Sequence, residues 1–118
     1  MILVDTSVWA DHLRSSDDEL IELLDRGAVL THTFVIEELA CGYLPQRDDF
    51  LRMIHRLPQA PPASHRELLK LIEDKKLFGT GLGSIDVHLI ASAMLANAKV
   101  LSRDKALSRE AARLGVAA

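Results

Sequence analysis

Four carboxylate residues stand where the local pattern would otherwise place an apolar residue or a helix cap: Asp5, Glu38, Asp86 and Asp104. Two of them follow short apolar runs, Asp5 directly and Asp104 after two further residues. Carboxylate oxygens are the ligands that Mg²⁺ and Mn²⁺ prefer, and acids gathered from distant parts of a chain commonly hold such ions. The chemistry that this set would support is metal-assisted hydrolysis of a phosphodiester.

The two acids that follow apolar runs each have a structural alternative. Asp5 precedes a helical pattern and could simply cap that helix, although the two hydroxyl residues after it could cap equally well. Asp104 lies between two basic residues, which makes a surface turn possible. The carboxyl ends of adjacent parallel strands meet at one edge of a sheet, where ligands bind in open α/β folds. This geometry favours a shared site for Asp5 and Asp104.

The other two acids lie on predicted helices. Glu38 falls nearer the apolar face of its helix than Glu37, with a solvated helix edge as the alternative. Asp86 lies in the first turn of a helix, where the helix dipole favours an anion. Asp86 also lies on the same apolar face of the helix as Leu89, where an unpaired charge that faces protein is costly. Ser84 is expected to cap the helix, so Asp86 is not needed for that role. We expect all four acids to converge within a few ångströms, an arrangement that requires a cation.

The elements that would position these acids alternate between short strands and helices. Apolar runs predict strands at residues 1–4, 28–32 and 100–101, with an edge strand at 116–117. Helical spacing predicts helices over 8–13, 20–24, 34 to about 42, 50–57, 64–72, 85–96 and 105–114, and a flexible glycine-rich loop over 79–84. Their expected caps include Ser16, Thr33 and the Ser64/Glu67 capping box. Helices between strands imply a parallel sheet covered on both faces, a three-layer α/β sandwich formed by one domain, residues 1–118.

Composition excludes several classes of protein. Only 4% of the residues are aromatic, which argues against the base-stacking track of a non-specific single-strand binder. Cys41 is the sole cysteine, so an internal disulfide and a thiolate zinc site are excluded and a reducing cytoplasm is expected. No apolar run approaches the ~20 residues of a spanning helix, and the first run ends at Asp5, too early for a secretory signal. The net charge is −3, yet residues 61–118 are net basic, so nucleic acid remains a possible ligand.

Four segments in this order and spacing resemble the PIN domain, and more narrowly the VapC toxins of bacterial type II toxin–antitoxin pairs. The segments are Met-Ile-Leu-Val-Asp5-Thr6-Ser7-Val-Trp, Phe-Val-Ile-Glu-Glu38-Leu-Ala-Cys-Gly42, Gly-Leu-Gly-Ser-Ile-Asp86-Val-His-Leu-Ile-Ala and Val-Leu-Ser-Arg-Asp104-Lys-Ala-Leu. The resemblance extends over nearly the whole chain. It implies an endoribonuclease that depends on Mg²⁺ or Mn²⁺.

The resemblance also assigns roles to residues. It selects Glu38 over Glu37, because the family's acid directly precedes Leu-Ala-x-Gly, whereas relatives often carry Gly at the position of Glu37. Thr6 or Ser7 matches a hydroxyl that supports the metal site. The catalytic acids are then Asp5, Glu38, Asp86 and Asp104, with Asp5, Asp86 and Asp104 as metal ligands.

Substrate and partners are expectations of the same kind. Basic side chains that follow the acids in sequence should bind the RNA phosphates: Arg14, Arg103 and Lys105. Specific ribonucleases tend to recognise loops and single strands, so a loop of tRNA or ribosomal RNA is the expected substrate. The resemblance implies an antitoxin that blocks the site, and a homodimer. Two alternatives are a metal-binding interaction module without turnover and a magnesium-dependent phosphotransfer domain.

Overall fold

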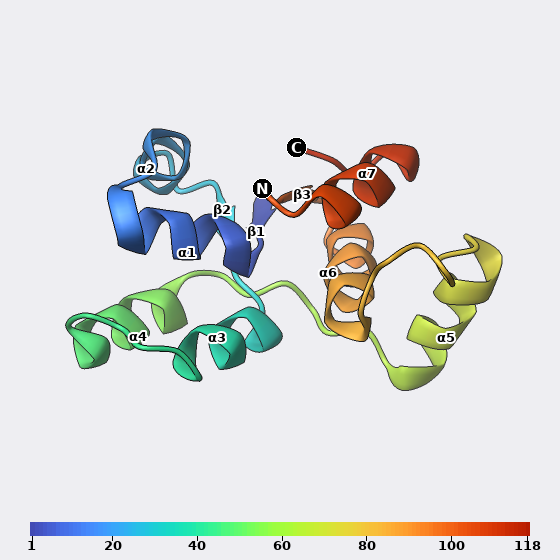
Figure 1. Ribbon diagram of the computed structural model, residues 1–118, viewed down its shortest axis with the longest axis horizontal. Helices are drawn as coiled ribbons and strands as arrows, with labels where there is room; N and C mark the ends of the chain where they lie inside the picture. Colours follow the sequence, from blue (N-terminus) through green and yellow to red (C-terminus); the bar gives the residue numbers. More distant parts are fainter.

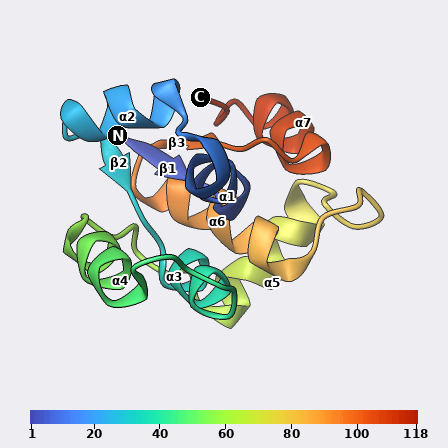
Figure 2. The ribbon, with the colours of Figure 1, turned by 60° about the vertical axis from the view of Figure 1, so that its left-hand side comes forward.

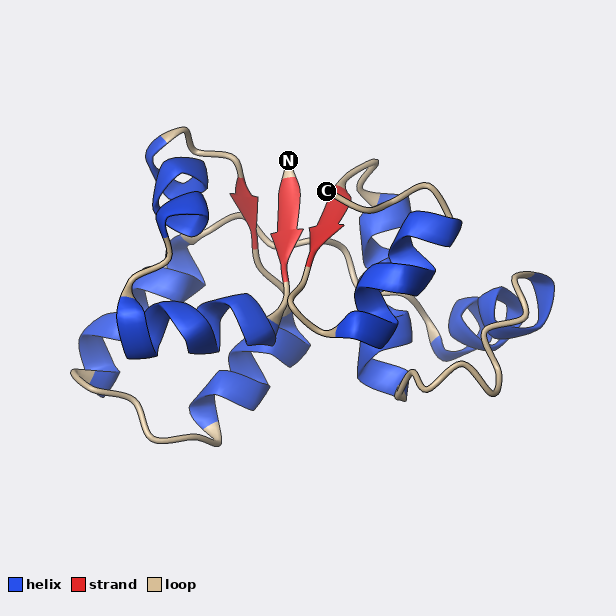
Figure 3. Ribbon diagram, turned by 45° about the horizontal axis from the view of Figure 1, so that its top comes forward, coloured by secondary structure: helices blue, strands red, loops and turns tan.

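A three-stranded parallel sheet forms the centre of the computed structural model, which describes all residues 1–118 (Figure 1). The strands are β1 (Ile2–Val4), β2 (Val29–Leu30) and β3 (Lys99–Leu101), in the order β2-β1-β3. Leu3 pairs with Leu30 on one side and with Val100 on the other. Because all strands run the same way, their carboxyl ends lie at one edge, where the arrowheads point in Figure 3.

The seven helices are divided between the two sides of this sheet (Figures 1 and 3). One group comprises α1 (Thr6–Ser15), α2 (Asp18–Asp25), α3 (Thr33–Ala40) and α4 (Arg47–Arg56), and the other comprises α5 (His65–Asp74), α6 (Ser84–Leu95) and α7 (Lys105–Arg113). The predicted α/β sandwich with a short parallel sheet is confirmed. None of the helices is long and apolar enough to cross a membrane.

The hydrophobic core holds the central strand and the first helix in place. Leu3, Val4, Val8 and Trp9 are completely shielded from solvent. The Trp9 ring meets the Phe50 ring edge-on, with the ring centroids 5.9 Å apart, an arrangement that aromatic pairs prefer. Burial on both sides of the turn between β1 and α1 fixes the backbone from which the first predicted acid projects.

The predicted helix caps were correct for α5 and wrong for α2, α3 and α6. Ser64 and Glu67 form the predicted capping box. Helix α2 is capped by Asp17, one residue after the predicted Ser16. Helix α3 is capped by His32 instead of Thr33.

His32 takes that capping role because its ring is buried at the start of α3. Its Nδ1 accepts from the amide of Phe34 at 3.0 Å, which leaves Nε2 to donate to Ser92 Oγ at 2.9 Å. Burial, followed by the nearby charge of His88, lowers the pKa of His32 below its ordinary 6.5. A neutral imidazole therefore joins α3 to α6.

The outer predicted strands are shorter in the structure. Residues 28–32 form a strand only at Val29–Leu30, after which Thr31 makes a single bridge to Gln59. The expected edge strand at 116–117 is reduced to one bridge between Ala117 and Val100.

Candidate active site

Asp5 is the buried acid at the carboxyl edge of the sheet. It directly follows β1 and is 6% exposed. Its Oδ2 accepts hydrogen bonds from Ser7 Oγ and Ser102 Oγ, both at 2.7 Å. Asp5 occupies the N-cap position of α1, but its side chain makes no capping bond. Capping therefore does not account for this residue, and two hydroxyls orient its carboxylate.

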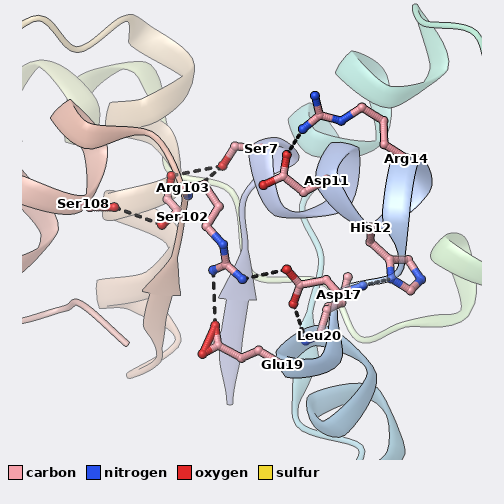
Figure 4. Close-up of polar contacts among 10 residues, drawn as sticks. All are labelled: Ser7, Asp11, His12, Arg14, Asp17, Glu19, Leu20, Ser102, Arg103 and Ser108. Carbon is pink, nitrogen blue, oxygen red and sulfur yellow. Dashed lines mark hydrogen bonds and ion pairs between the residues drawn. The ribbon is translucent and has the colours of Figure 1, made fainter.

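Ser102 is a site residue that the sequence analysis missed. It follows β3 as Asp5 follows β1, so its position directly after a strand of the parallel sheet was the available signal. Its Oγ lies 3.3 Å from Ser7 Oγ, which in turn accepts from the amide of Arg103 at 2.9 Å (Figure 4). The loop after β3 is thus joined to the start of α1 by hydroxyl groups.

Glu38 is distinguished from Glu37 by its contact and not by burial. Both side chains are exposed, so the predicted approach of Glu38 to the apolar face is not what separates them. Thr6 Oγ1 donates to Glu38 Oε1 at 2.7 Å, and both residues line one groove. Glu37 makes no side-chain hydrogen bond or ion pair. The carboxylate of Glu38 therefore faces α1 and the carboxyl edge of the sheet.

Asp86 is half-buried in the first turn of α6. Burial raises its pKa above the ordinary 3.8, as do the nearby charges of Asp5, Asp104 and Glu38, against the opposing effect of a hydrogen bond from the amide of Gly83. That bond measures 3.2 Å. The expected cap Ser84 is instead the first residue of the helix, and Gly83 is the N-cap. Glycine has no side chain to cap with, so Asp86 satisfies the exposed amide itself.

Asp104 both caps a helix and belongs to the acidic group. Its Oδ1 accepts from the amide of Leu107 at 2.9 Å at the start of α7. Its other oxygen has no partner, and its charge contributes to the raised pKa of Asp86. The structural and functional interpretations of Asp104 are therefore compatible.

The four acids face a common region without forming a preassembled metal site. No group of three or more of these side chains lies close enough together to hold an ion, which corrects the expectation of convergence within a few ångströms. Carboxylates repel one another, and this repulsion adds to the effect of burial, the larger cause, in raising the pKa of Asp86. Every donor is an oxygen, the set that Mg²⁺ and Mn²⁺ bind. The residues present fit such an ion.

The three basic residues predicted to bind RNA differ in the partners that their side chains have in the folded protein. The guanidinium of Arg103 donates to Asp17 at 2.8 Å and to Glu19 at 3.2 Å (Figure 4). Arg14 pairs with Asp11 on the same helix, and Lys105 is exposed without a side-chain partner. Arg103 thus joins the loop after β3 to α2, whereas Lys105 is free to meet a phosphate.

The segment that leads to Asp86 is anchored by an arginine clamp, which consists of Glu110, Arg109 and Arg113 on α7. The buried carboxylate of Glu110 accepts from Arg109 Nε at 2.9 Å and from Arg113 Nε at 2.7 Å. Arg109 also donates to the carbonyl of Thr80 at 2.6 Å, and Arg113 to that of Lys75 at 2.8 Å. The loop predicted to be flexible is therefore tied to α7 at Thr80, and the end of α5 that precedes it is tied at Lys75.

Glu110→Gln should lower the melting temperature at neutral pH, because it removes the charge that orders both arginines. Hydrogen bonds from Arg109, then from Arg113, lower the pKa of Glu110 below its ordinary 4.5. A lowered carboxyl pKa stabilises the fold above the ordinary value, and this contribution is lost as the pH falls through the folded-state pKa. The difference between wild type and variant should therefore shrink between about pH 5 and pH 3.

Thermal unfolding followed across this pH range measures the effect of the clamp. Glu73→Gln on the exposed side of α5 makes the same change without an ion pair and should leave the curve unchanged. A Glu110→Gln variant that melts with the wild type at every pH would show that the clamp adds no stability.

The fold and the acidic edge define a PIN domain, and comparison with known proteins agrees. The family model described as PIN domain matches residues 2–112. Ribonuclease VapC32 of Mycobacterium tuberculosis, recorded from strains CDC 1551 / Oshkosh and ATCC 25618 / H37Rv, is 46% identical over 118 residues, covering 99% of this chain and 95% of that protein. The chain therefore belongs to the PIN-domain family and, within it, to the VapC ribonucleases, the toxin class that its motifs indicated.

Solved structures match the fold at lower identity. The crystal structure of FitAcB from Neisseria gonorrhoeae superposes with a TM-score of 0.66 at 21% identity, covering 99% of this chain and 95% of that one. PAE2754 from Pyrobaculum aerophilum gives a TM-score of 0.62 at 13% identity, with 92% and 78% coverage. At these identities the likeness concerns the fold alone.

Proposed function

We propose that this protein is a metal-dependent endoribonuclease, formed by one PIN domain of residues 1–118, that acts as the toxin of a type II toxin–antitoxin pair. The observation that carries the proposal is the proximity of Asp86 to Asp5, Asp104 and Glu38, whose charges add to the effect of burial in raising the pKa of Asp86. These acids come from four separate segments, and their shared position at the carboxyl edge of a parallel sheet is where such folds bind ligands.

Each acid has a role in the proposed reaction. Asp5, Asp86 and Asp104 would hold Mg²⁺ or Mn²⁺, which supplies a Lewis acid and a water of lowered pKa when bound. Asp5 is oriented for this by the hydroxyls of Ser7 and Ser102. Glu38, held by Thr6, would orient the water that attacks the phosphodiester.

RNA binding would depend on the basic side chains around these acids. Lys105 follows Asp104 directly and has no side-chain partner, so a phosphate is its natural ligand. Arg14 could exchange Asp11 for a phosphate at little cost, because exposed ion pairs contribute little stability. Arg103 would have to release two carboxylates, and we assign it mainly to holding α2 beside the site. The proposed substrate is a loop of tRNA or ribosomal RNA, with an antitoxin and a second copy of the chain as protein partners.

Cleavage of total bacterial RNA by the purified chain tests the proposal. Incubations with Mg²⁺, with Mn²⁺ and with EDTA should give discrete fragments only when a metal is present, and sequencing of the new ends identifies the RNA and the bond. RNA that remains intact under every condition, with protein shown to be folded and free of antitoxin, would overturn the proposal.

A further inference from the structure

The largest hollow of the surface is a groove of about 590 Å³ between α1 and the end of α3. These two helices lie side by side (Figures 1 and 2). Thr6 and Glu38 line its inner end, so the groove is continuous with the proposed catalytic acids. Leu13, Leu39 and Leu44 provide apolar walls. An RNA strand that crosses the acids therefore has this groove beside its scissile bond.

Tyr43 stands at the rim of the groove on a turn that is held in place. It is the only tyrosine of the chain and is 92% exposed. The next residue, Leu44, is buried, and Arg47 donates to the carbonyl of Ala40 at 2.7 Å and to that of Gly42 at 3.2 Å. The backbone is thus anchored on both sides of an exposed aromatic ring. Exposed aromatic rings on an anchored backbone are surfaces on which unpaired RNA bases stack.

The groove carries three charged side chains, the carboxylates of Asp11 and Glu38 and the guanidinium of Arg14. Arg14 lines the same groove from α1, and its side chain is 76% exposed. Its partner Asp11 also lines the groove, so the guanidinium is already directed into this space. Glu38 belongs to the catalytic acids at one end of the groove, and Arg14 would exchange Asp11 for a phosphate. The apolar walls and the aromatic face of Tyr43 then match the sugar and base of a single nucleotide.

We propose that this groove is the subsite for a nucleotide that flanks the scissile bond, with Tyr43 stacked on its base and Arg14 at its phosphate. The proposal rests on the ribonuclease function proposed above. It assigns a specificity-determining position to Tyr43, because the base that stacks best there sets where the strand is cut. A single ring fits one base, in agreement with the scarcity of aromatic residues in the chain.

Binding of short RNAs that carry 2-aminopurine tests the subsite independently of cleavage. The probes are single-stranded heptamers of mixed sequence with the fluorescent base at each position in turn, bound in Mg²⁺ to an Asp86→Asn protein that does not cut them. Stacking on Tyr43 should quench one position of the probe. Tyr43→Leu should lose that quenching and weaken binding roughly 5- to 150-fold, the range expected for stacking on one base. Tyr43→Phe should retain both properties.

Two controls separate the possible failures. Leu69→Ala removes another exposed apolar side chain, on α5 and outside the groove, and should change neither binding nor quenching. Wild type that cuts no RNA would overturn the proposed function. Wild type that cuts RNA while Tyr43→Leu binds, quenches and cuts equally would overturn the subsite alone and leave the groove to a protein partner. Absence of both cutting and probe binding would overturn both.

Discussion

Asp86→Asn is expected to abolish RNA cleavage while the protein keeps its fold. Asparagine retains an oxygen that can accept from the amide of Gly83, so the start of α6 is preserved. It removes the negative charge that faces Asp5, Asp104 and Glu38. Metal-assisted stabilisation of developing charge contributes several kcal/mol, so we expect a loss of about 100-fold or more in cleavage rate.

The stability of the same variant should be equal to or higher than that of the wild type at neutral pH. The pKa of Asp86 is raised, chiefly by burial. Its ionised form therefore opposes folding, and this penalty is absent below the ordinary pKa of 3.8 and develops as the pH rises through the folded-state value. The gain in melting temperature should consequently vanish towards pH 3, about one unit below that value.

Cleavage assays and thermal melts on one preparation measure both effects. Asp25→Asn, on the exposed end of α2, makes the same chemical change away from the site and should leave activity and melting unchanged. An Asp86→Asn protein that unfolds at room temperature would make Asp86 a structural residue, and one that cuts RNA at the wild-type rate would remove it from the catalytic set.

Mg²⁺ or Mn²⁺ should raise the melting temperature of the wild type, and EDTA should reverse the increase. The acidic side chains repel one another in the folded state, so a cation that binds there favours folding. A free concentration ten times the dissociation constant would contribute about 1.4 kcal/mol. For a domain of this length, this corresponds to an increase of about 5 °C. Cleavage should stop when the metal is withdrawn although the protein stays folded.

Variants of the acids identify where the metal binds. The increase should be much smaller in Asp86→Asn and Asp5→Asn, whereas Asp25→Asn should respond like the wild type. Added NaCl at equal ionic strength controls for screening of surface charge. An equal increase in all four proteins would place the ion outside the proposed site, and no increase in any of them would contradict a preformed affinity for metal.

The fold could be predicted from sequence because its signals are local. Apolar runs such as residues 1–4 predict buried strands. An acid directly after such a strand must lie at the carboxyl edge of a parallel sheet. The placement of Asp5 followed from this rule, and Asp104 lies two residues beyond β3, at the start of α7. The α3 cap could not be predicted in the same way. His32 Nδ1 accepts from the Phe34 amide with its ring held in place by tertiary packing, which no local pattern indicates.

The supporting contacts of the site could not be predicted, because they join residues that are distant in the chain. Ser102 acts through Asp5, and Arg109 through the carbonyl of Thr80. Neither partner can be identified from spacing. Choosing Glu38 over Glu37 needed the family motif, since both are equally exposed and only the Thr6 contact separates them.

The hydrogen bond from Ser102 to Asp5 joins residues 97 positions apart, and β1 at the start of the chain lies between β2 and β3. During synthesis, the first strand leaves the ribosome long before its second neighbour exists. A nascent chain that still lacks β3 has only Ser7 of the two hydroxyls that orient Asp5, and it lacks Asp104 itself. If Asp104 acts as proposed, nuclease activity arises only after β3 and the start of α7 have been synthesised, and a nascent chain that ends before them is inert towards RNA.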